Sequence, residues 1–405
     1  MISIVEASAI VLENVKVLPP RQMELAECLG RVLGEDIRSR EDTPPFTNSA
    51  MDGFAVRAGD TESASVESPR IFQVLGDLRA GETTGTRVGK GEAIRIMTGA
   101  PLPAGADAVV MVEDTREGEK GVEILRPVWA GENVRPAGES VRKGETVLPA
   151  GTLLRPQEIG MLAALGYPRP LVVPPPAAAI VTTGDELLDI SEELKPGKIR
   201  DCNRYSLAAA VERCGGVPVP LASTCDRGGE LKARLQEALA CDLVITSGGI
   251  SAGKYDLVPE ILRELGGELL IRKVAMKPGK PLTFTVVGQT PIFSLPGNPV
   301  SVLVSFLQFV RPALLKMQGK KNLGLPEVEA VLAEDCLEET DRTHLVRVRV
   351  ERSEEGYAAR PTGPQGSGIL KSLVLANGLM VVPPDAGPLP AGTRVKVILL
   401  DDAAE

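Results

Sequence analysis

The sequence is poor in histidine and has no paired-cysteine motif, and each shortage excludes a kind of chemistry. His344 is the single histidine, so a Ser-His-Asp or Cys-His nucleophile would depend on a residue beside an alternating strand pattern. The six cysteines are scattered without a C-x-x-C pair, which removes zinc-ligand spacing and favours core thiols over disulfides. Acid–base or metal chemistry must therefore rest on carboxylates and lysines.

An excess of positive charge and long apolar runs are also lacking. The net charge is −9 at pH 7, whereas binding to nucleic-acid phosphates needs a basic face, so no nucleic-acid partner is expected. No apolar run is judged long enough to span a bilayer, and the N-terminal MISIVEASAI lacks a basic segment and a cleavage site. We therefore expect a cytoplasmic protein without membrane association.

The chain divides by its sequence patterns into three regions. Its 405 residues are too many for one core, and about three domains are expected. The first region, residues 1–174, begins with a helix, because Ser3 and Glu6 form an S-x-x-E capping box before an apolar-periodic run. Short strand and turn patterns then predict a β-rich subdomain inserted at about residues 47–142.

The second and third regions differ in secondary structure. Residues 175–322 alternate strand and helix patterns, which predicts an α/β domain with a mainly parallel, doubly wound sheet covered by helices on both faces. Pro312 is expected to kink or end the last helix of this region. Residues 323–405 contain the alternating runs THLVRVRVE and TRVKVILL, which predict a small sheet or barrel.

One loop of the second region combines small residues with an acid. Residues 246–256 read TSGGISAGKYD and follow a short apolar strand pattern. Gly248, Gly249 and Ser251 let the backbone approach a ligand closely and direct N–H groups at it. The carboxylate of Asp256 would repel a bare anion in such a cradle, which suggests that a metal ion lies between them.

Three acidic residues follow three different strands of the predicted sheet. Glu186, Asp226 and Asp256 each lie just past the carboxyl end of a strand pattern, and ligands bind at that edge where the strand order switches. Converging carboxylates repel one another unless a cation or basic side chains lie among them, and oxygen ligands suit Mg²⁺. Each acid alone could instead cap a helix; the three together with the glycines favour a site.

The next segment supplies positive charge and a helix start. Lys273, Lys277 and Lys280 occur in IRKVAMKPGKPLTF, where a Pro-Gly turn can direct ammonium groups at a tetrahedral oxyanion. Pro296 and Asn298 belong to LPGNPVS, whose amide-rich helix start is an anion site in principle. The alternatives are a solvated turn and an ordinary helix start.

These motifs together are similar to those of a known family. TTGDEL, TSGGISAGKYD, MKPGKPLTF and LPGNPVS occur in this order, after FTNSAMDGFAV, IMTGAPLPAGADAVVMVED and NVRPAGE and before PTGPQGSG. This series resembles the molybdopterin molybdenumtransferases, the MoeA-type enzymes related to the E domain of gephyrin. The resemblance covers essentially the whole chain.

The resemblance implies an activity, an assembly and a fold. The family inserts molybdate into adenylylated molybdopterin and releases AMP with the help of Mg²⁺. It implies a homodimer, with the site between one subunit's sheet and the partner's N-terminal part, a molybdopterin-binding central domain and a C-terminal β-barrel. A contact with a molybdopterin adenylyltransferase is left open, and one sequence does not separate molybdate from tungstate.

The family motifs also imply roles for individual residues. Without the family, Asp52 would be a turn residue, Thr98 a strand-end hydroxyl, and Ser367 part of an ordinary glycine-rich loop. Arg347 lies on the polar face of LVRVRV, where most arginines face solvent. The implied catalytic residues are Asp52, Thr98, Glu186, Lys273 and Lys277; the substrate-binding residues are Gly248, Gly249, Ser251, Lys280, Pro296, Asn298, Arg347 and Ser367; and the metal ligands are Glu186, Asp226 and Asp256.

One position departs from the family, and two other functions remain as alternatives. Ser140 stands where the family commonly has Asp, so the role of that acid is weakened, lost or taken by Glu139. A nucleotide pyrophosphatase of the CinA type shares the GDEL loop but lacks the AMDG-containing N-terminal half. A non-catalytic scaffold like gephyrin would need linkers or a trimerising domain, which this chain lacks.

Overall fold

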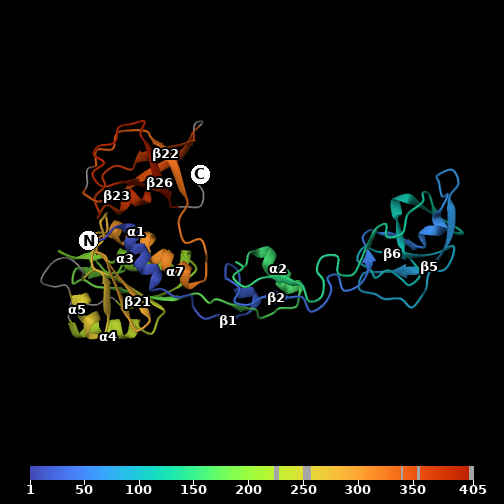
Figure 1. Ribbon diagram of the computed structural model, residues 1–405, viewed down its shortest axis with the longest axis horizontal. Coiled ribbons are helices and arrows are strands. Elements are labelled where there is room, and N and C mark those ends of the chain that lie inside the picture. The colour runs from blue at the N-terminus through green and yellow to red at the C-terminus, as the bar shows by residue number, and fades with distance from the viewer. Residues whose placement is uncertain (223–227, 250–256, 339–340, 354–355, 401–405) are drawn as a thin grey trace. The chain divides into compact units, whose positions relative to one another are not determined.

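The computed structural model describes residues 1–222, 228–249, 257–338, 341–353 and 356–400. The chain forms two compact units, coloured by residue number in Figure 1. Unit 1 comprises Met1–Met23, Gly30–Gly34 and Leu171–Glu405, and unit 2 comprises Glu24–Leu29 and Glu35–Pro170.

A six-stranded sheet forms the centre of unit 1. Its order is β16-β13-β17-β21-β20-β18, in which the first four strands are parallel and β20 alone is reversed, being antiparallel to both β21 and β18. The expectation of a mainly parallel sheet is confirmed. In the order of the sheet the strands are β16 (Val217–Pro220), β13 (Ala177–Thr182), β17 (Leu243–Ser247), β21 (Thr290–Leu295), β20 (Thr283–Val287) and β18 (Glu268–Ile271).

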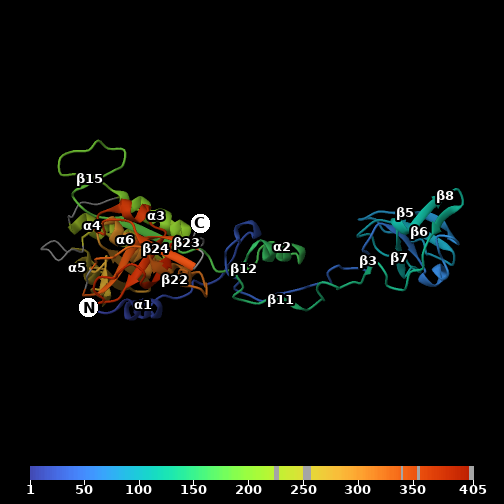
Figure 2. The same ribbon diagram turned by 90° about the horizontal axis from the view of Figure 1, so that it is seen from above.

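Helices cover both faces of this sheet, because its strands are apolar on both sides. In β13, Ala178 and Ile180 pack into one core and Ala179 and Val181 into the other. The fold is therefore doubly wound, as expected: Figure 1 shows α4 and α5 on one side of β21 and α1, α3 and α7 on the other, and Figure 2 shows the same chain turned by 90°. The first core includes α1 (Ile4–Glu13), α3 (Cys202–Arg213), α6 (Pro299–Ser305) and α7 (Arg311–Met317), and the second includes α4 (Gly228–Ala238) and α5 (Leu257–Glu264).

The helix from Pro299 to Met317 bears on two expectations. Of the kink or end expected at Pro312, the end is excluded: a π-helical stretch, Phe306–Val310, precedes the proline, and α7 continues beyond it. The 19 residues are also apolar and long enough to cross a membrane by length and composition, so the judgement that no run was long enough is wrong. Because 67% of its apolar window is buried inside the protein, this helix fits the core of a folded domain.

The C-terminal part of unit 1 is the predicted β-barrel. Five strands close on themselves, because β23 pairs with both β24 and β25. The short strand β19 (Met276–Lys277) of the α/β part runs parallel to β23 and joins the two parts. The barrel strands are β22 (Glu327–Leu332), β23 (Thr343–Ser353), β24 (Gly356–Pro361), β25 (Gly378–Val382) and β26 (Arg394–Leu399), with α8 (Leu370–Val374) between β24 and β25.

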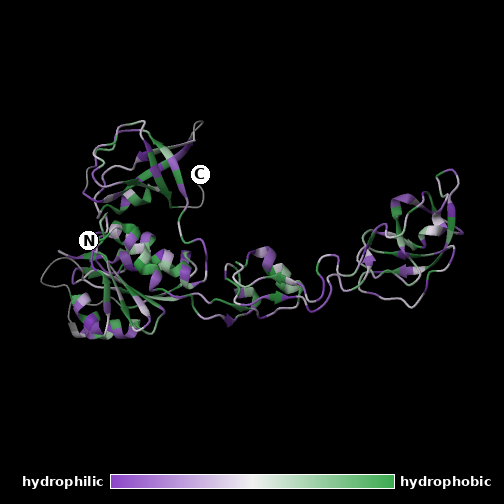
Figure 3. Cartoon of the chain, viewed as in Figure 1, coloured by the Kyte–Doolittle hydropathy of each residue, from purple (hydrophilic) through white to green (hydrophobic). Residues whose placement is uncertain are grey.

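Unit 2 contains the predicted β-rich part. A six-stranded sheet has the order β7-β4-β6-β5-β9-β8, and Phe54, Phe72 and Val110 lie in its core. A single helix, α2 (Pro156–Ala164), begins with a proline and shows a hydrophobic and a hydrophilic side in Figure 3. The strands are β4 (Gly53–Val56), β5 (Arg70–Leu78), β6 (Glu92–Ile96), β7 (Ala108–Met111), β8 (Thr115–Gly118) and β9 (Gly121–Ile124).

Short pairs of strands complete both units. In unit 1, β1 (Arg21–Gln22) pairs with β12 (Leu171–Val172), and β14 (Leu187–Leu188) with β15 (Ile199–Arg200). In unit 2, β2 (Ile37–Arg38) pairs with β11 (Thr146–Leu148), and β3 (Asn48–Ser49) with β10 (Val134–Arg135). The 3₁₀ turns are Leu25–Glu27, Ala58–Thr61 and Val112–Asp114.

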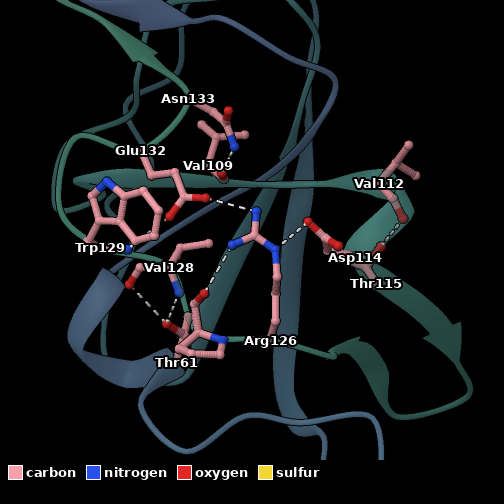
Figure 4. A network of polar contacts seen from close by, with 11 residues as sticks. Thr61, Val109, Val112, Asp114, Thr115, Arg126, Val128, Trp129, Glu132 and Asn133 are labelled. Atoms are coloured by element: carbon pink, nitrogen blue, oxygen red, sulfur yellow. Dashed lines mark hydrogen bonds and ion pairs between the residues drawn. The ribbon is translucent and has the colours of Figure 1, made fainter.

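A polar network holds the segment that follows β9 (Figure 4). Arg126 donates from Nε to Asp114 at 2.7 Å and from Nη2 to Glu132 at 2.8 Å. The hydrogen bonds to these two carboxylates raise the pKa of Arg126 above its usual value. Next to it, the Thr61 hydroxyl accepts a hydrogen bond from the backbone N–H of Val128 at 3.0 Å. One guanidinium therefore fixes two stretches of chain.

Candidate active site

The strand order of unit 1 reverses at β13, and this defines a ligand-binding edge. The chain leaves β13 for β16 on one side and then returns to β17 on the other. In open α/β sheets, ligands bind outside the carboxyl ends of the strands at such a switch point. Thr182 ends β13 and Ser247 ends β17, and Gly248 and Gly249 follow Ser247.

The two glycines are required by the backbone at this edge. Gly248 has a φ of +98°, and a Cβ there would lie 2.2 Å from the carbonyl oxygen of Thr183. Gly249 has a φ of +65°, and its Cβ would lie 3.0 Å from Val258. Gly248 thus brings backbone close to backbone, whereas Gly249 lies against the side chains of Val258 and Thr183, and neither position has room for a side chain. The predicted Ser251 lies outside the described residues.

Asn203, in the first turn of α3, ties the switch point to the loop before α6. Its Nδ2 donates to Ser247 Oγ at 3.0 Å and to the carbonyl of Gly297 at 2.7 Å. Ser247 Oγ in turn donates to the carbonyl of Pro296 at 3.3 Å. Sequence reasoning did not identify Asn203 or Ser247, since an Asn in a first helical turn is an ordinary residue there. These bonds position Pro296, a predicted substrate-binding residue.

A cavity of about 450 Å³ in unit 1 brings several predicted residues together. It extends from the Pro-Gly turn after β19 to the start of α6 and the glycine-rich loop before α8. The predicted residues that line it are Lys277, Lys280, Pro296, Asn298 and Ser367.

Hydrogen bonds link the barrel to this cavity. Asn298 Nδ2 donates to Ser367 Oγ at 3.0 Å, and the backbone N–H of Val300 donates to the carbonyl of Ser367 at 3.2 Å. The glycine-rich loop is therefore held directly at the start of α6. Lys273 is exposed and does not line the cavity, whereas Lys277 and Lys280 do.

Lys277 is paired with a carboxylate that the sequence did not reveal. Its Nζ lies 2.9 Å from Glu338 Oε2, and both residues line the cavity. Burial opposes ionisation of Glu338, but the hydrogen bond and charge of Lys277 outweigh it, so the pKa of Glu338 is lowered. The pairing of β19 with β23 explains the contact, because it places Lys277 beside His344, 3.5 Å from the same carboxylate.

His344 is fully buried and neutral near pH 7. Burial, followed by the positive charge of Lys277, lowers its pKa to about 4. Neither ring nitrogen has a hydrogen-bond partner among the described residues. This imidazole therefore adds no fixed positive charge to the cavity.

Arg347 corrects the expectation of a solvent-facing side chain. It is 0% exposed, although it alternates with apolar residues of β23. Its neighbour on the same face, Leu345, packs into the core shared with the α/β part, so that face is covered. Arg347 donates to Ser372 Oγ at 3.1 Å and to the carbonyl of Gly366 at 3.2 Å. It therefore supports the loop that carries Ser367.

Of the three predicted metal ligands, only Glu186 lies among the described residues. Its side chain is exposed on the loop after β13, and Asp226 and Asp256 lie outside the described part of the chain. Within that part, no group of three or more His, Cys, Asp or Glu side chains could hold a metal ion. The metal assignment stays a prediction.

Unit 2 pairs two of the predicted catalytic residues. Asp52 Oδ1 accepts hydrogen bonds from both the backbone N–H and the hydroxyl of Thr98, each at 2.7 Å. These bonds lower the pKa of Asp52, and both side chains remain exposed. Ser140, at the position that departs from the family, is exposed in a turn beside the exposed Glu139.

Three family models match consecutive parts of the chain. The MoeA N-terminal region (domain I and II) matches residues 2–166, the “Probable molybdopterin binding domain” matches 179–316, and the MoeA C-terminal region (domain IV) matches 329–400. The class of protein is thereby defined: the chain is an enzyme of molybdenum cofactor biosynthesis.

Similar proteins assign the family. A molybdopterin molybdenumtransferase of Staphylococcus aureus is 35% identical over 392 residues, which is 96% of this chain and 93% of that protein. One of Bacillus subtilis is 36% identical over 93% of this chain and 89% of its own length. The crystal structure of a molybdopterin biosynthesis MoeA protein from Pyrococcus horikoshii superimposes with a TM-score of 0.84 at 33% identity, covering both chains completely. The chain belongs to the molybdopterin molybdenumtransferase, or MoeA, family, and the pyrophosphatase and scaffold alternatives are not favoured.

Proposed function

We propose that this protein inserts molybdate into adenylylated molybdopterin and releases AMP. The observation that carries the proposal is the cavity of about 450 Å³, which places Lys277 and Lys280 beside the start of α6. Relatives that share 35% identity over nearly the whole chain are molybdopterin molybdenumtransferases. A tetrahedral oxyanion suits this cavity, because two ammonium groups and the backbone amides at the start of α6 lie there.

The residues of the switch point have a distinct part in the proposal. Gly248 and Gly249 permit the positive-φ backbone after β17, which would direct N–H groups at a pterin or phosphate group. Two Mo–S bonds form at the dithiolene while oxygen of molybdate leaves with the two thiol protons as water, and hydrolysis of a P–O bond of the substrate's diphosphate releases AMP. Lysine side chains would stabilise the negative charge of molybdate or of the departing phosphate.

Mg²⁺ is part of the proposal through the chemistry of its ligands. Glu186, Asp226 and Asp256 would hold it, because carboxylate oxygens are the ligands that Mg²⁺ prefers. When bound, the ion would neutralise charge on the substrate's diphosphate. Glu186 fits this role in being exposed at the ligand-binding edge of the sheet.

The assembly and the location are also proposed. We propose a cytoplasmic homodimer, on the strength of the family, and a molecular mass from light scattering near that of one 42.8 kDa chain would refute the dimer. A contact with a molybdopterin adenylyltransferase would appear as co-sedimentation of the two purified proteins.

The activity is tested by AMP release. Purified protein with adenylylated molybdopterin, molybdate and Mg²⁺ is expected to release AMP, and omission of molybdate is expected to suppress that release. Parallel reactions with tungstate measure which oxyanion is preferred. A folded sample that releases no AMP with either oxyanion would refute the proposed function.

A further inference from the structure

The ion pair between Lys277 and Glu338 places a negative charge inside a cavity suited to anions. The two side chains are 37% and 30% exposed, and their charged atoms lie 2.9 Å apart. The ammonium group of Lys277 therefore already has an anionic partner before any oxyanion enters. An oxyanion bound at Lys277 would lie close to that carboxylate, and like charges at such a distance repel each other strongly in a partly buried site.

The neighbours of Glu338 limit how this repulsion can be relieved. The positive charges that act on Glu338 are those of Lys277 on β19 and Arg347 on β23, whereas His344 is neutral near pH 7. Lys280 and Arg342 line the same cavity, and Cys336 is the nearest titratable group before Glu338 in the chain. Arg347 is engaged with Ser372 and Gly366. The buried His344 lies 3.5 Å from Glu338 and forms no hydrogen bond among the described residues. A proton taken up at Glu338 could therefore be shared with His344 Nδ1.

We propose that Glu338 is a specificity-determining residue of the oxyanion cavity. It neutralises Lys277 when no oxyanion is bound, and it must release Lys277 and take up a proton when a fully ionised oxyanion binds. This inference rests on the proposed function, because it assigns the cavity to an oxyanion substrate.

The same carboxylate discriminates between kinds of oxyanion. Molybdate and sulfate carry no proton near neutral pH, so they have nothing to donate to Glu338. Hydrogen phosphate carries a hydroxyl that can donate to an ionised carboxylate, which turns a repulsive contact into a hydrogen bond. Glu338 therefore disfavours molybdate relative to phosphate when it is ionised, and it loses this effect when it is protonated.

The direction of the pH dependence follows from the change at Glu338. Loss of the Lys277 hydrogen bond and the arrival of a neighbouring anion both raise its pKa in the bound state. Binding then takes up a proton between the two pKa values, so affinity for molybdate increases as the pH falls, by up to about tenfold per pH unit.

The test is titration calorimetry of the full-length protein with molybdate, sulfate and inorganic phosphate between pH 6 and 8.5. Glu338→Gln removes the charge and keeps the shape. At pH 8 it is expected to bind molybdate about tenfold or more tightly than the unsubstituted protein, with little change for phosphate. The heat of molybdate binding should depend on the ionisation enthalpy of the buffer in the unsubstituted protein, and this dependence should vanish in the variant.

Glu334→Gln is the matched control. Glu334 is an exposed acid just before the same loop, 3.5 Å from Arg360, and it is not among the residues that line the cavity. The substitution Glu334→Gln removes an equal charge and should leave the affinities for molybdate, sulfate and phosphate unchanged.

Weaker molybdate binding by Glu338→Gln would show that Glu338 only holds Lys277 in place. That result would overturn the proposal even if AMP release is normal. A molybdate affinity that is independent of pH in the unsubstituted protein would overturn it as well. Absence of molybdate binding to both proteins would overturn it together with the assignment of the cavity.

Discussion

Substituting Gly248 by alanine tests whether the close approach of its backbone to Thr183 shapes the switch point. A Cβ at this position would lie 2.2 Å from the carbonyl oxygen of Thr183, where no normal contact is shorter than 3.0 Å. Its φ of +98° is also unfavourable for a residue with a side chain. The ends of β13 and β17 must therefore move apart, which would also displace Ser247 from Asn203.

The magnitude follows from two separate contributions. The left-handed backbone conformation costs a non-glycine residue about 1–2 kcal/mol, and overpacking against backbone adds about 1–3 kcal/mol. Gly248→Ala is thus expected to lower the free energy of unfolding by about 2–5 kcal/mol. For a unit of this size, each kcal/mol lowers the melting temperature by about 2–4 °C.

Gly266→Ala provides the matched control in the same unit. Gly266 has a comparable φ of +82°, but a Cβ there would meet no atom within 4 Å. It should show only the conformational contribution of about 1–2 kcal/mol. Calorimetric melting of the two variants measures the difference, and AMP release measures the displacement of the site. Equal melting temperatures and equal activities would refute the claim that close approach at Gly248 shapes the site.

Three further substitutions test other contacts. Asn203→Ala leaves Ser247 and the Gly297 carbonyl without their donor, so it should cost about 1–3 kcal/mol and reduce AMP release; an unchanged melting temperature would contradict this. Arg126→Met leaves two carboxylates unpaired in unit 2 and should lower thermal stability by more than Arg234→Met does. Arg234→Met breaks only the exposed ion pair with Glu237, which is worth at most about 1 kcal/mol. Equal losses of stability would contradict the stabilising role of the Arg126 network. Asp52 has a lowered pKa in the folded state because Thr98 donates to it, so its contribution to stability is present above the ordinary Asp value of 3.8 and is lost as the pH falls through the lower folded value. Melting curves from pH 5 to 2.5 should therefore fall less steeply for Asp52→Asn, and parallel curves would contradict the role of Thr98.

Local sequence rules predicted the elements whose stabilising contacts are near in the chain. The first helix begins as the capping box indicates, since Ser3 Oγ accepts from the N–H of Glu6 at 3.1 Å and the Glu6 carboxylate accepts from the N–H of Ser3 at 2.8 Å. The alternation of strands and helices predicted the mainly parallel sheet for a different reason: a helix between two strands provides the crossover that parallel strands need, although paired residues such as Ala178 and Leu243 are far apart in the chain. The periodicity within each strand or helix is local, so the sequence alone contains it.

Contacts between distant segments could not be predicted in this way. Asn203 bonds to residues that lie 44 and 94 positions away in the chain. Arg347 looked solvent-facing because its strand alternates, but the alternation does not show that another core covers its polar face. Glu338 lies 61 positions from Lys277, and only the pairing of β19 with β23 brings them together.

This last pairing determines how charge is arranged in the candidate site. The register sets Lys277 opposite His344, so the lysine that the motif MKPGKPLTF provides is held next to residues of the barrel. A lysine in a solvated turn would keep its full charge available to any anion. Because Glu338 neutralises Lys277, the cavity presents less positive charge than its lysines suggest, and an oxyanion must compete with a carboxylate of the protein itself. Selectivity in the cavity then depends on whether the incoming oxyanion can tolerate that carboxylate, as well as on the number of cations around it.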